Sequence, residues 1–347
     1  MPVTVITGFL GAGKTTLLRR LLLDGGQRLA VLVNEFGEVG IDGDLIASCG
    51  FCPEEERAGR LVELANGCLC CTVQEEFLPT MQTLLERADQ LDGIVVETSG
   101  LALPEPLVAA FGWPEIRTRT RVQAVVAVVD GEALAAGHVV GDAKAVEAQR
   151  RADPSLDHLT AIEELFEEQL EAADLVLVSR ADRIGAEQLQ AVAERLQPLL
   201  RPGTTVLPMA RGELEPGLIL GASFPREESG VAAGHPLQHH DQPHEHEHHD
   251  HTHVAMVSMV VRRRGTWDRP ALEQRLAALL AEEPVIRLKG RLRQAGRPLL
   301  LQVQAVGPRL ECWYEGAATA EEEGQLELVV LGGAADRDRL ERAFATL

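Results

Sequence analysis

The stretch "GFLGAGKTT" at residues 8–16 constrains the fold more than any other part of this 347-residue chain. It fits the pattern G-x-x-x-x-G-K-[ST], with an apolar segment before it and leucines at helical spacing after it. In such a strand–loop–helix unit, glycines let backbone N–H groups turn toward phosphate oxygens, and the helix N-terminus adds positive potential. The alternative is a glycine-rich turn that only joins a strand to a helix. The complete pattern in this context predicts a phosphate-binding loop.

The residues of this loop have distinct expected roles. Lys14 is expected to reach the β- and γ-phosphates of a nucleotide, and the Thr15 hydroxyl is expected to bind Mg²⁺. Nucleotide-binding residues in the loop are expected to be Gly8, Gly11, Ala12, Gly13, Lys14, Thr15 and Thr16.

Short apolar segments alternate with amphipathic ones through the first two-thirds of the chain. The apolar segments are continuous rather than alternating, as is typical of parallel strands that are covered on both faces. Between them, apolar residues recur at helical spacing, for example over 77–88 and 159–170. A repeated strand–helix–strand order predicts an α/β fold with a doubly wound, mostly parallel sheet. The strands are expected at 3–7, 29–35, 93–100, 124–130, 175–182 and 205–210.

Composition divides the chain into three parts. Residues 225–253 are mostly Gly, Pro, Glu, Asp and His, and nine of the eleven histidines fall there. Such a segment buries too little apolar surface to fold alone, which predicts a flexible linker. Its imidazoles favour either a weak metal reservoir or a simply solvated linker. We therefore expect a P-loop domain at 1–224 and a smaller α+β domain at 254–347, with strands at 254–262, 298–307 and 326–333 around a helix at 268–281.

Charge and composition also limit the partners. The formal net charge is −20, which disfavours nucleic acid or an anionic membrane as a partner because phosphate contacts need Lys and Arg clusters. The first residues lack the charged start of a signal peptide, and no apolar run is long enough to span a bilayer. Six cysteines, three of them crowded together, do not fit secreted disulfide pairing. The expectation is a soluble, cytoplasmic protein.

Two further segments are typical of a nucleotide switch. In "ETSG", Glu97 is placed to orient water or the Mg²⁺ shell, and the Gly100 amide to meet a γ-phosphate. "NEFGEVGIDGD" follows the expected second strand, where a mobile switch loop would lie. Its Glu38 and Asp42 have either a metal or switch role, or belong to a solvated loop.

The segment "SRAD" at 179–182 ends another expected strand, at the place where P-loop GTPases carry Asn-Lys-x-Asp. Asp182 can accept from the two N–H donors of guanine, which adenine lacks. Ser179 and Arg180 stand where the usual pattern has Asn and Lys. The motif favours a guanine nucleotide through Asp182.

Three cysteines are crowded in "ELANGCLCCTV": Cys68, Cys70 and Cys71. Thiolates are soft donors that suit Zn²⁺, Cu⁺ or Co²⁺, and three ligands leave a coordination position open. Packing of small buried thiols is the alternative. The crowding favours a metal site. Cys49 and Cys52 form a weaker C-x-x-C signal for an auxiliary metal or redox pair, and Cys312 is interpreted as a core residue.

Together, "GFLGAGKTT", "NEFGEVGIDG", "ELANGCLCCTV" and "ETSGLALPEPLV" resemble the CobW family of metallochaperone GTPases over nearly the whole chain. The resemblance implies binding of GTP and Mg²⁺, slow GTP hydrolysis with Lys14 and Glu97 at the catalytic site, and Cys68, Cys70 and Cys71 as ligands of a transition metal. It further implies delivery of Co²⁺ to the cobalt chelatase complex for insertion into the corrin ring of cobalamin. A zinc chaperone of the same family is the first alternative. The others are a non-catalytic, His-rich metal buffer and an ATP-dependent small-molecule kinase.

Overall fold

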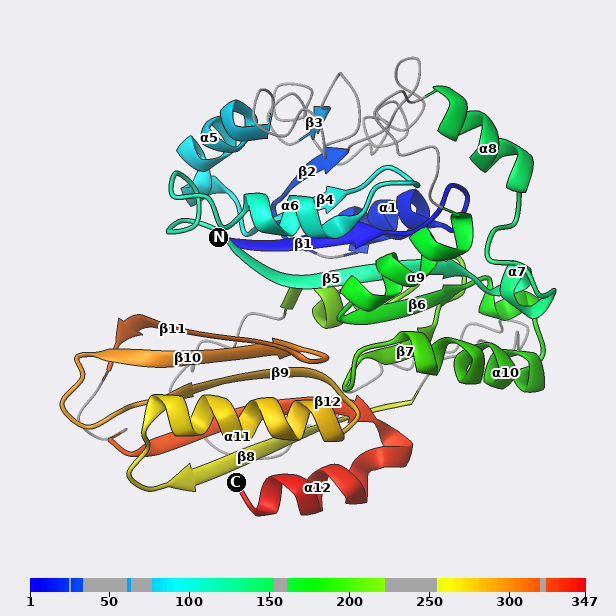
Figure 1. Cartoon of the computed structure of the whole chain (residues 1–347). Coiled ribbons are helices and arrows are strands. Elements are labelled where there is room, and N and C mark those ends of the chain that lie inside the picture. The colour runs from blue at the N-terminus through cyan, green and yellow to red at the C-terminus, as the bar shows by residue number, and fades with distance from the viewer. Residues whose placement is uncertain (25, 34–60, 64–76, 153–160, 222–254, 319–322) are drawn as a thin grey trace, which may run out of the picture.

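The structure is a computed structural model that describes residues 1–347 except for 25, 34–60, 64–76, 153–160, 222–254 and 319–322. The described residues form a seven-stranded sheet and a five-stranded sheet, each with its own helices (Figure 1). The predicted fold class is confirmed: a doubly wound parallel sheet is followed by a smaller C-terminal α+β domain. No described helix has the length and apolar character needed to cross a membrane.

The first sheet has the strand order β3-β2-β4-β1-β5-β6-β7, and every neighbouring pair is parallel. All six predicted strands are present. Strands β1 and β5 end where predicted, whereas β2, β4, β6 and β7 end two or three residues earlier, where the chain turns into loops at the carboxyl edge. The three-residue β3 was not predicted. The bounds are β1 (Pro2–Thr7), β2 (Leu29–Val33), β3 (Leu61–Glu63), β4 (Gly93–Glu97), β5 (Arg121–Asp130), β6 (Leu175–Ser179) and β7 (Thr205–Pro208).

Helices cover both faces of this sheet, as the continuously apolar strands require. Alternate strand residues point to opposite faces, so Ile6 and Val126 pack with helix α1, whereas Val5 and Val125 pack with α5 and α6 on the other face. Helices α9 and α10 continue that second layer over β5 and β6. The bounds are α1 (Lys14–Asp24), α5 (Leu78–Glu86), α6 (Pro104–Ala110), α7 (Gly131–Ala135), α8 (Ala143–Ala152), α9 (Ile162–Ala172) and α10 (Ala186–Leu196).

The second sheet is antiparallel, with the order β11-β10-β9-β12-β8. Two helices, α11 and α12, pack their leucines and Phe344 on one of its faces. The predicted strands and helix are present; β9 and β11 were not predicted, because charged residues interrupt the apolar pattern of both. The bounds are β8 (Met256–Arg264), α11 (Arg269–Glu282), β9 (Val285–Leu292), β10 (Leu299–Val306), β11 (Arg309–Ala317), β12 (Gln325–Gly333) and α12 (Arg337–Ala345).

Buried polar contacts join the two sheets. Arg287 of β9 donates to the carbonyl oxygens of Leu218 and Ile219, at 2.9 and 3.2 Å. Burial lowers the pKa of Arg287 to about 10, so the guanidinium stays protonated at neutral pH. Fully buried Asp174 accepts from Arg309 of β11, at 2.5 Å. Asp174 immediately precedes β6, so this contact lies at the amino end of a strand, away from the carboxyl edge where the nucleotide loops lie.

Candidate functional site

The loop between β1 and α1 has the backbone shape that its glycines predict. Gly8 has φ +135°, and a Cβ there would lie 2.1 Å from the Val128 carbonyl oxygen, so the loop passes directly against β5. Gly13 has φ +107°, which side chains other than hydrogen rarely allow. Lys14 is only 7 % exposed, and its Nζ donates to the Phe9 carbonyl oxygen at 3.3 Å. The Lys14 side chain therefore folds back over the loop between β1 and α1, the expected phosphate-binding loop.

Thr15 and Glu97 meet at the carboxyl edge of the sheet. The Thr15 hydroxyl donates to Glu97 Oε1 at 3.0 Å. Glu97 ends β4, pairs in register with Ile6 of β1, and is 5 % exposed. The next residue fixes this edge, because the Thr98 N–H donates to the Ile6 carbonyl oxygen at 2.9 Å. A hydroxyl and a carboxylate placed together are hard oxygen donors, the set that Mg²⁺ prefers. The residues present therefore fit Mg²⁺.

A cavity of about 600 Å³ brings most of the predicted nucleotide-binding residues together. Gly8 and Gly100 lie beside it rather than in its wall: a Cβ on Gly100 would sit 2.6 Å from the Leu10 backbone nitrogen, so Gly100 packs against the loop. The wall combines the phosphate loop, Glu97 and the "SRAD" segment. Its residues are Leu10, Gly11, Ala12, Gly13, Lys14, Thr15, Thr16, Glu97, Ser179, Arg180, Asp182, Arg183, Met209, Arg211 and Gly212.

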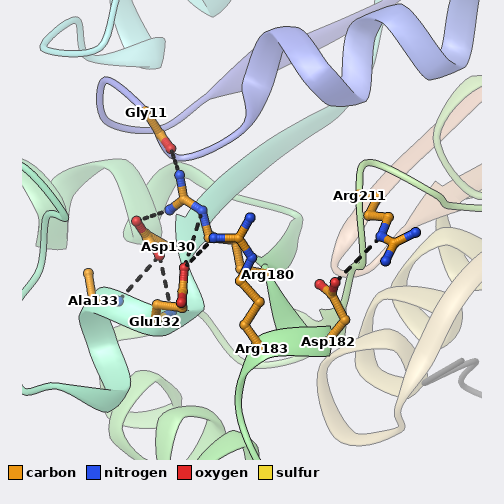
Figure 2. Close-up of polar contacts among 8 residues, drawn as sticks. All are labelled: Gly11, Asp130, Glu132, Ala133, Arg180, Asp182, Arg183 and Arg211. Atoms are coloured by element: carbon orange, nitrogen blue, oxygen red, sulfur yellow. Dashed lines mark hydrogen bonds and ion pairs between the residues drawn. The ribbon is translucent and has the colours of Figure 1, made fainter. Parts of the chain in front are cut away.

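Arg180 connects the "SRAD" segment to the phosphate loop. Its backbone is left-handed, with φ +55°, and its Nη2 donates to the Gly11 carbonyl oxygen at 2.8 Å (Figure 2). The same guanidinium pairs with Asp130 at the end of β5, and its Nε lies 3.6 Å from Glu132 Oε2. Asp130 is held in place in turn, because its Oδ1 accepts from the N–H groups of Glu132 and Ala133 at the start of α7. Arg180 thus links the "SRAD" segment to the loop between β1 and α1.

Asp182 lies in the wall of the same cavity, next to an arginine that was not predicted. Arg211, in the loop after β7, places its Nε 3.7 Å from Asp182 Oδ2 (Figure 2). Arg211 is 74 % exposed, and ion pairs in such settings contribute little stability. In the wall of the same cavity, the Ser179 Oγ is buried and has no hydrogen-bond partner among the described residues.

Neither Asp130 nor Arg211 was predicted as a site residue. The sequence carried a local indication for Asp130 and none for Arg211. Asp130 is the last residue of a predicted strand, at the edge where the nucleotide loops were expected. Glu132 follows it by two positions. Arg211 follows the last predicted strand of the sheet without any recognisable motif, so its meeting with Asp182 depends on the fold.

Several predicted residues lie outside the described part of the chain. These are the proposed switch residues Glu38 and Asp42, the three clustered cysteines Cys68, Cys70 and Cys71, and also Cys49, Cys52 and the His-rich segment. Among the residues that are described, no three His, Cys, Asp or Glu side chains are grouped as a metal site. Cys312 is described; it packs against the core of the C-terminal sheet, and burial raises the pKa of its thiol to about 12.

Comparisons with known proteins agree with this fold. Residues 2–208 match the CobW/HypB/UreG nucleotide-binding domain, and residues 256–347 match the cobalamin synthesis protein cobW C-terminal domain. The chain is 45% identical over 348 residues to "Zinc chaperone CobW" of Pseudomonas aeruginosa, covering 100% of this chain and 91% of that protein. It is 44% identical to the protein of the same name from a Sinorhizobium species, covering 96% of this chain and 92% of the relative.

More distant relatives are also similar over the full length. "Zinc chaperone YjiA" of Escherichia coli is 30% identical, with 99% of this chain and 98% of that protein covered. A crystal structure of Zn(II)-bound YjiA GTPase from E. coli covers 100% of this chain and 98% of its own, at 23% identity and a TM-score of 0.40. The sequence matches show that this chain belongs to the CobW/HypB/UreG family of nucleotide-binding proteins and carries the CobW C-terminal domain.

Proposed function

We propose that this protein is a GTPase that binds a transition-metal ion and delivers it to a partner protein. Its affinity for the metal would depend on which nucleotide is bound. The observation that carries this proposal is the single cavity in which Lys14, the Thr15–Glu97 pair and Asp182 meet. The division into a P-loop domain at 1–224, a His-rich linker at 225–253 and a C-terminal domain at 254–347 is part of the proposal.

The phosphate side of the cavity supports nucleotide hydrolysis. The Lys14 ammonium, which donates to the Phe9 carbonyl oxygen, lies in the cavity wall where it can contact phosphate oxygens, and the loop amides from Gly11 to Thr16 form the cradle. Thr15 and Glu97 are the residues that would hold Mg²⁺. When bound, Mg²⁺ neutralises phosphate charge and polarises the phosphate group that is cleaved. Glu97 also orients water at the edge of the cavity, and the Gly100 amide meets the γ-phosphate.

The part of the cavity around Asp182, which we call the base side, supports selection of guanine. Asp182 accepts from the two guanine N–H donors, and those charge-assisted hydrogen bonds replace the exposed Arg211 contact at little cost. Arg180 takes the place of the usual lysine. Its hydrogen bond to the Gly11 carbonyl oxygen and its pair with Asp130 hold the base-side loop against the phosphate loop.

Changing Asp182 to Asn tests base selection. We expect GTP binding to weaken by about 100-fold or more, because hydrogen bonds to a charged group contribute about 1.5–3 kcal/mol each and two are affected. Binding of xanthosine triphosphate should improve, since xanthine carries a carbonyl oxygen where guanine has its amino group, and an Asn amide donates to it. Calorimetry with GTP, ATP and xanthosine triphosphate measures this. Asp338→Asn, at an exposed position on α12, is the matched control. Equal affinity of the natural protein for GTP and ATP would contradict base reading by Asp182.

The metal side of the proposal depends on the clustered cysteines. Cys68, Cys70 and Cys71 supply soft thiolate ligands, and Glu38 and Asp42 belong to the switch that responds to the γ-phosphate. The His-rich segment acts as a weak, multi-site reservoir. Zinc is the favoured cargo, because full-length relatives at 44% and 45% identity carry the name zinc chaperone. Cobalt for the cobalt chelatase complex is the second candidate, supported by the cobalamin synthesis description of the C-terminal domain family.

Competition between the two metals tests the choice of cargo. The full-length protein is loaded with Mg²⁺ and a non-hydrolysable GTP analogue, and bound metal is measured at equal, buffered free Zn²⁺ and Co²⁺. We expect Zn²⁺ to occupy the tight site, in keeping with the general affinity order for such ligands. Retention of Co²⁺ against equal free Zn²⁺ requires selection by site geometry, and would replace the zinc proposal with the cobalt one.

A further inference from the structure

The C-terminal domain contains a second cavity that the proposed nucleotide and metal chemistry does not use. Its volume is about 650 Å³, and it lies where β8 leads into α11 and where the β9–β10 connection and β11 come together (Figure 1). Three arginines and two aromatic residues dominate its wall. The residues that define it are Trp267, Arg269, Arg293, Gln294, Arg297 and Tyr314.

The aromatic wall of this cavity is fixed by hydrogen bonds. The Trp267 indole N–H donates to the Gly324 carbonyl oxygen at 3.1 Å. Gln294 connects the two aromatic residues: its Nε2 donates to the main-chain carbonyl oxygen of Trp267 at 3.0 Å, and its Oε1 accepts from the Tyr314 hydroxyl at 2.5 Å. Since both aromatic residues and the amide between them have partners, the cavity is preformed and a ligand would not have to build it.

The three arginines differ in how far their hydrogen-bonding capacity is used. Arg269 is engaged, with its Nε 2.7 Å from Glu273 Oε1 and its Nη2 donating to the Cys312 carbonyl oxygen at 2.8 Å. Arg293 is different: its Nε and Nη1 are buried and have no hydrogen-bond partner in the described part of the chain. Arg297 has its guanidinium carbon 5.6 Å from the centroid of the Tyr314 ring. Neither Arg293 nor Arg297 forms an ion pair with a described carboxylate.

The described acidic residues in the wall form no ion pair with Arg293 or Arg297. Asp268 is used as the N-cap of α11, where its side chain accepts from the Ala271 N–H at 3.2 Å. Glu323 lines the cavity without reaching ion-pair distance of Arg293 or Arg297 among the described contacts. Residues 256–347 hold 14 Lys and Arg against 13 Asp and Glu, so this region is nearly neutral although the chain carries a net charge of −20. Buried guanidinium N–H groups without acceptors are costly, and because Arg293 lines the cavity, a shift of its side chain toward a bound anion would satisfy them.

We infer that this cavity is a binding site for a small oxyanion: a phosphate or carboxylate group carried by a small molecule. Arginine suits such groups because its planar donors match the oxygens of a phosphate or carboxylate in pairs. Arg293 and Arg297 supply the free donors, whereas Trp267 and Tyr314 form an apolar wall for the rest of the ligand. The inference is independent of the proposed function, since the nucleotide cavity is lined by a separate set of residues.

Titration with two probes tests the site. The full-length protein carrying Lys14→Ala, which disables the phosphate loop, is freed of metal and titrated by calorimetry with pyrophosphate and, separately, with tricarballylate. We expect one saturable site for at least one probe. Arg293→Gln should weaken binding at least tenfold, and Arg342→Gln, an exposed arginine on α12, should not change it. Stronger binding of pyrophosphate assigns the ligand to the phosphates, and stronger binding of tricarballylate assigns it to the carboxylates.

A second variant distinguishes a loss of anion binding from a loss of folding. Arg297→Gln removes the more exposed of the two free arginines, and its effect should be in the same direction as that of Arg293→Gln, with unchanged thermal melting. Absence of saturable binding for both probes would overturn the inference. Equal weakening in Arg342→Gln would also overturn it, because it would show attraction to general positive charge rather than to this cavity.

Discussion

Replacing Lys14 with Ala is expected to weaken GTP binding by about 100-fold and to abolish measurable turnover. The substitution removes a cation that contacts ionised phosphate oxygens inside a largely buried loop, and the loss of such charge-assisted contacts amounts to about 3 kcal/mol. The fold should survive, because the Lys14 ammonium donates to the Phe9 carbonyl oxygen, a contact that water can replace. Calorimetry with GTP and a phosphate-release assay provide the two measurements.

Lys144 is the matched control for this experiment. It is an exposed lysine on α8, outside the wall of the nucleotide cavity, so Lys144→Ala should bind GTP as the natural protein does. Equal GTP affinity of the Lys14→Ala variant and the natural protein would show that the phosphates bind elsewhere. It would also remove the catalytic role proposed for this loop.

Replacing Cys70 with Ser should weaken metal binding in the GTP state by about 100-fold or more, because a hydroxyl is a far poorer ligand for Zn²⁺ or Co²⁺ than a thiolate. With Co²⁺ as the probe, the natural protein should show intense thiolate-to-cobalt charge-transfer absorption, and the variant should lose much of it. Metal binding should also release protons, since a free thiol titrates near pH ~8.5 and must be deprotonated to coordinate. The affinity should therefore fall as the pH is lowered.

Cys312 provides the control for the cysteine experiment. It packs against the core of the C-terminal sheet, and burial raises the pKa of its thiol, which keeps it protonated and unavailable as a ligand. Cys312→Ser should leave metal affinity unchanged, with at most a small loss of stability. If the charge-transfer band survives the loss of Cys68, Cys70 and Cys71 together, the ligands lie elsewhere, for example at Cys49 and Cys52.

The sequence predicted those features that depend on local patterns. The phosphate loop follows from glycine and lysine spacing, and the structure places Lys14, Thr15 and Glu97 around one cavity. Continuous apolar strands predicted a sheet that is covered on both faces, which the two apolar layers around β1 and β5 confirm. These features are readable because each is encoded within a few consecutive residues.

Features that depend on distant parts of the chain could not be predicted. Strand β9 carries Arg287. A charged residue is expected to be solvent-exposed, but the Arg287 guanidinium is buried against the carbonyl oxygens of Leu218 and Ile219. The three residues of β3 are too few to form a pattern. Arg211 contacts Asp182 because β7 and β6 are neighbours in the sheet, and no sequence motif predicts that contact. The link from Arg180 to the Gly11 carbonyl oxygen likewise spans the cavity between two separate loops.

Nucleotide control of metal affinity is the central claim of the proposed function, and it rests on linkage. If GTP tightens the metal site, then the metal must tighten GTP binding by the same factor. The γ-phosphate is the only chemical difference between GTP and GDP. A difference in metal affinity between the two states therefore measures how strongly the phosphate loop communicates with the cysteine segment.

The most direct test is a titration of the full-length protein with buffered free Zn²⁺, once with Mg²⁺ and a non-hydrolysable GTP analogue and once with Mg²⁺ and GDP. We expect a tight site in the GTP-analogue state whose affinity is at least tenfold higher than in the GDP state. This difference should disappear in the Cys70→Ser variant and persist in Cys312→Ser. Equal Zn²⁺ affinity in the two nucleotide states of the natural protein would contradict the account, because the nucleotide would then have no means of controlling metal release.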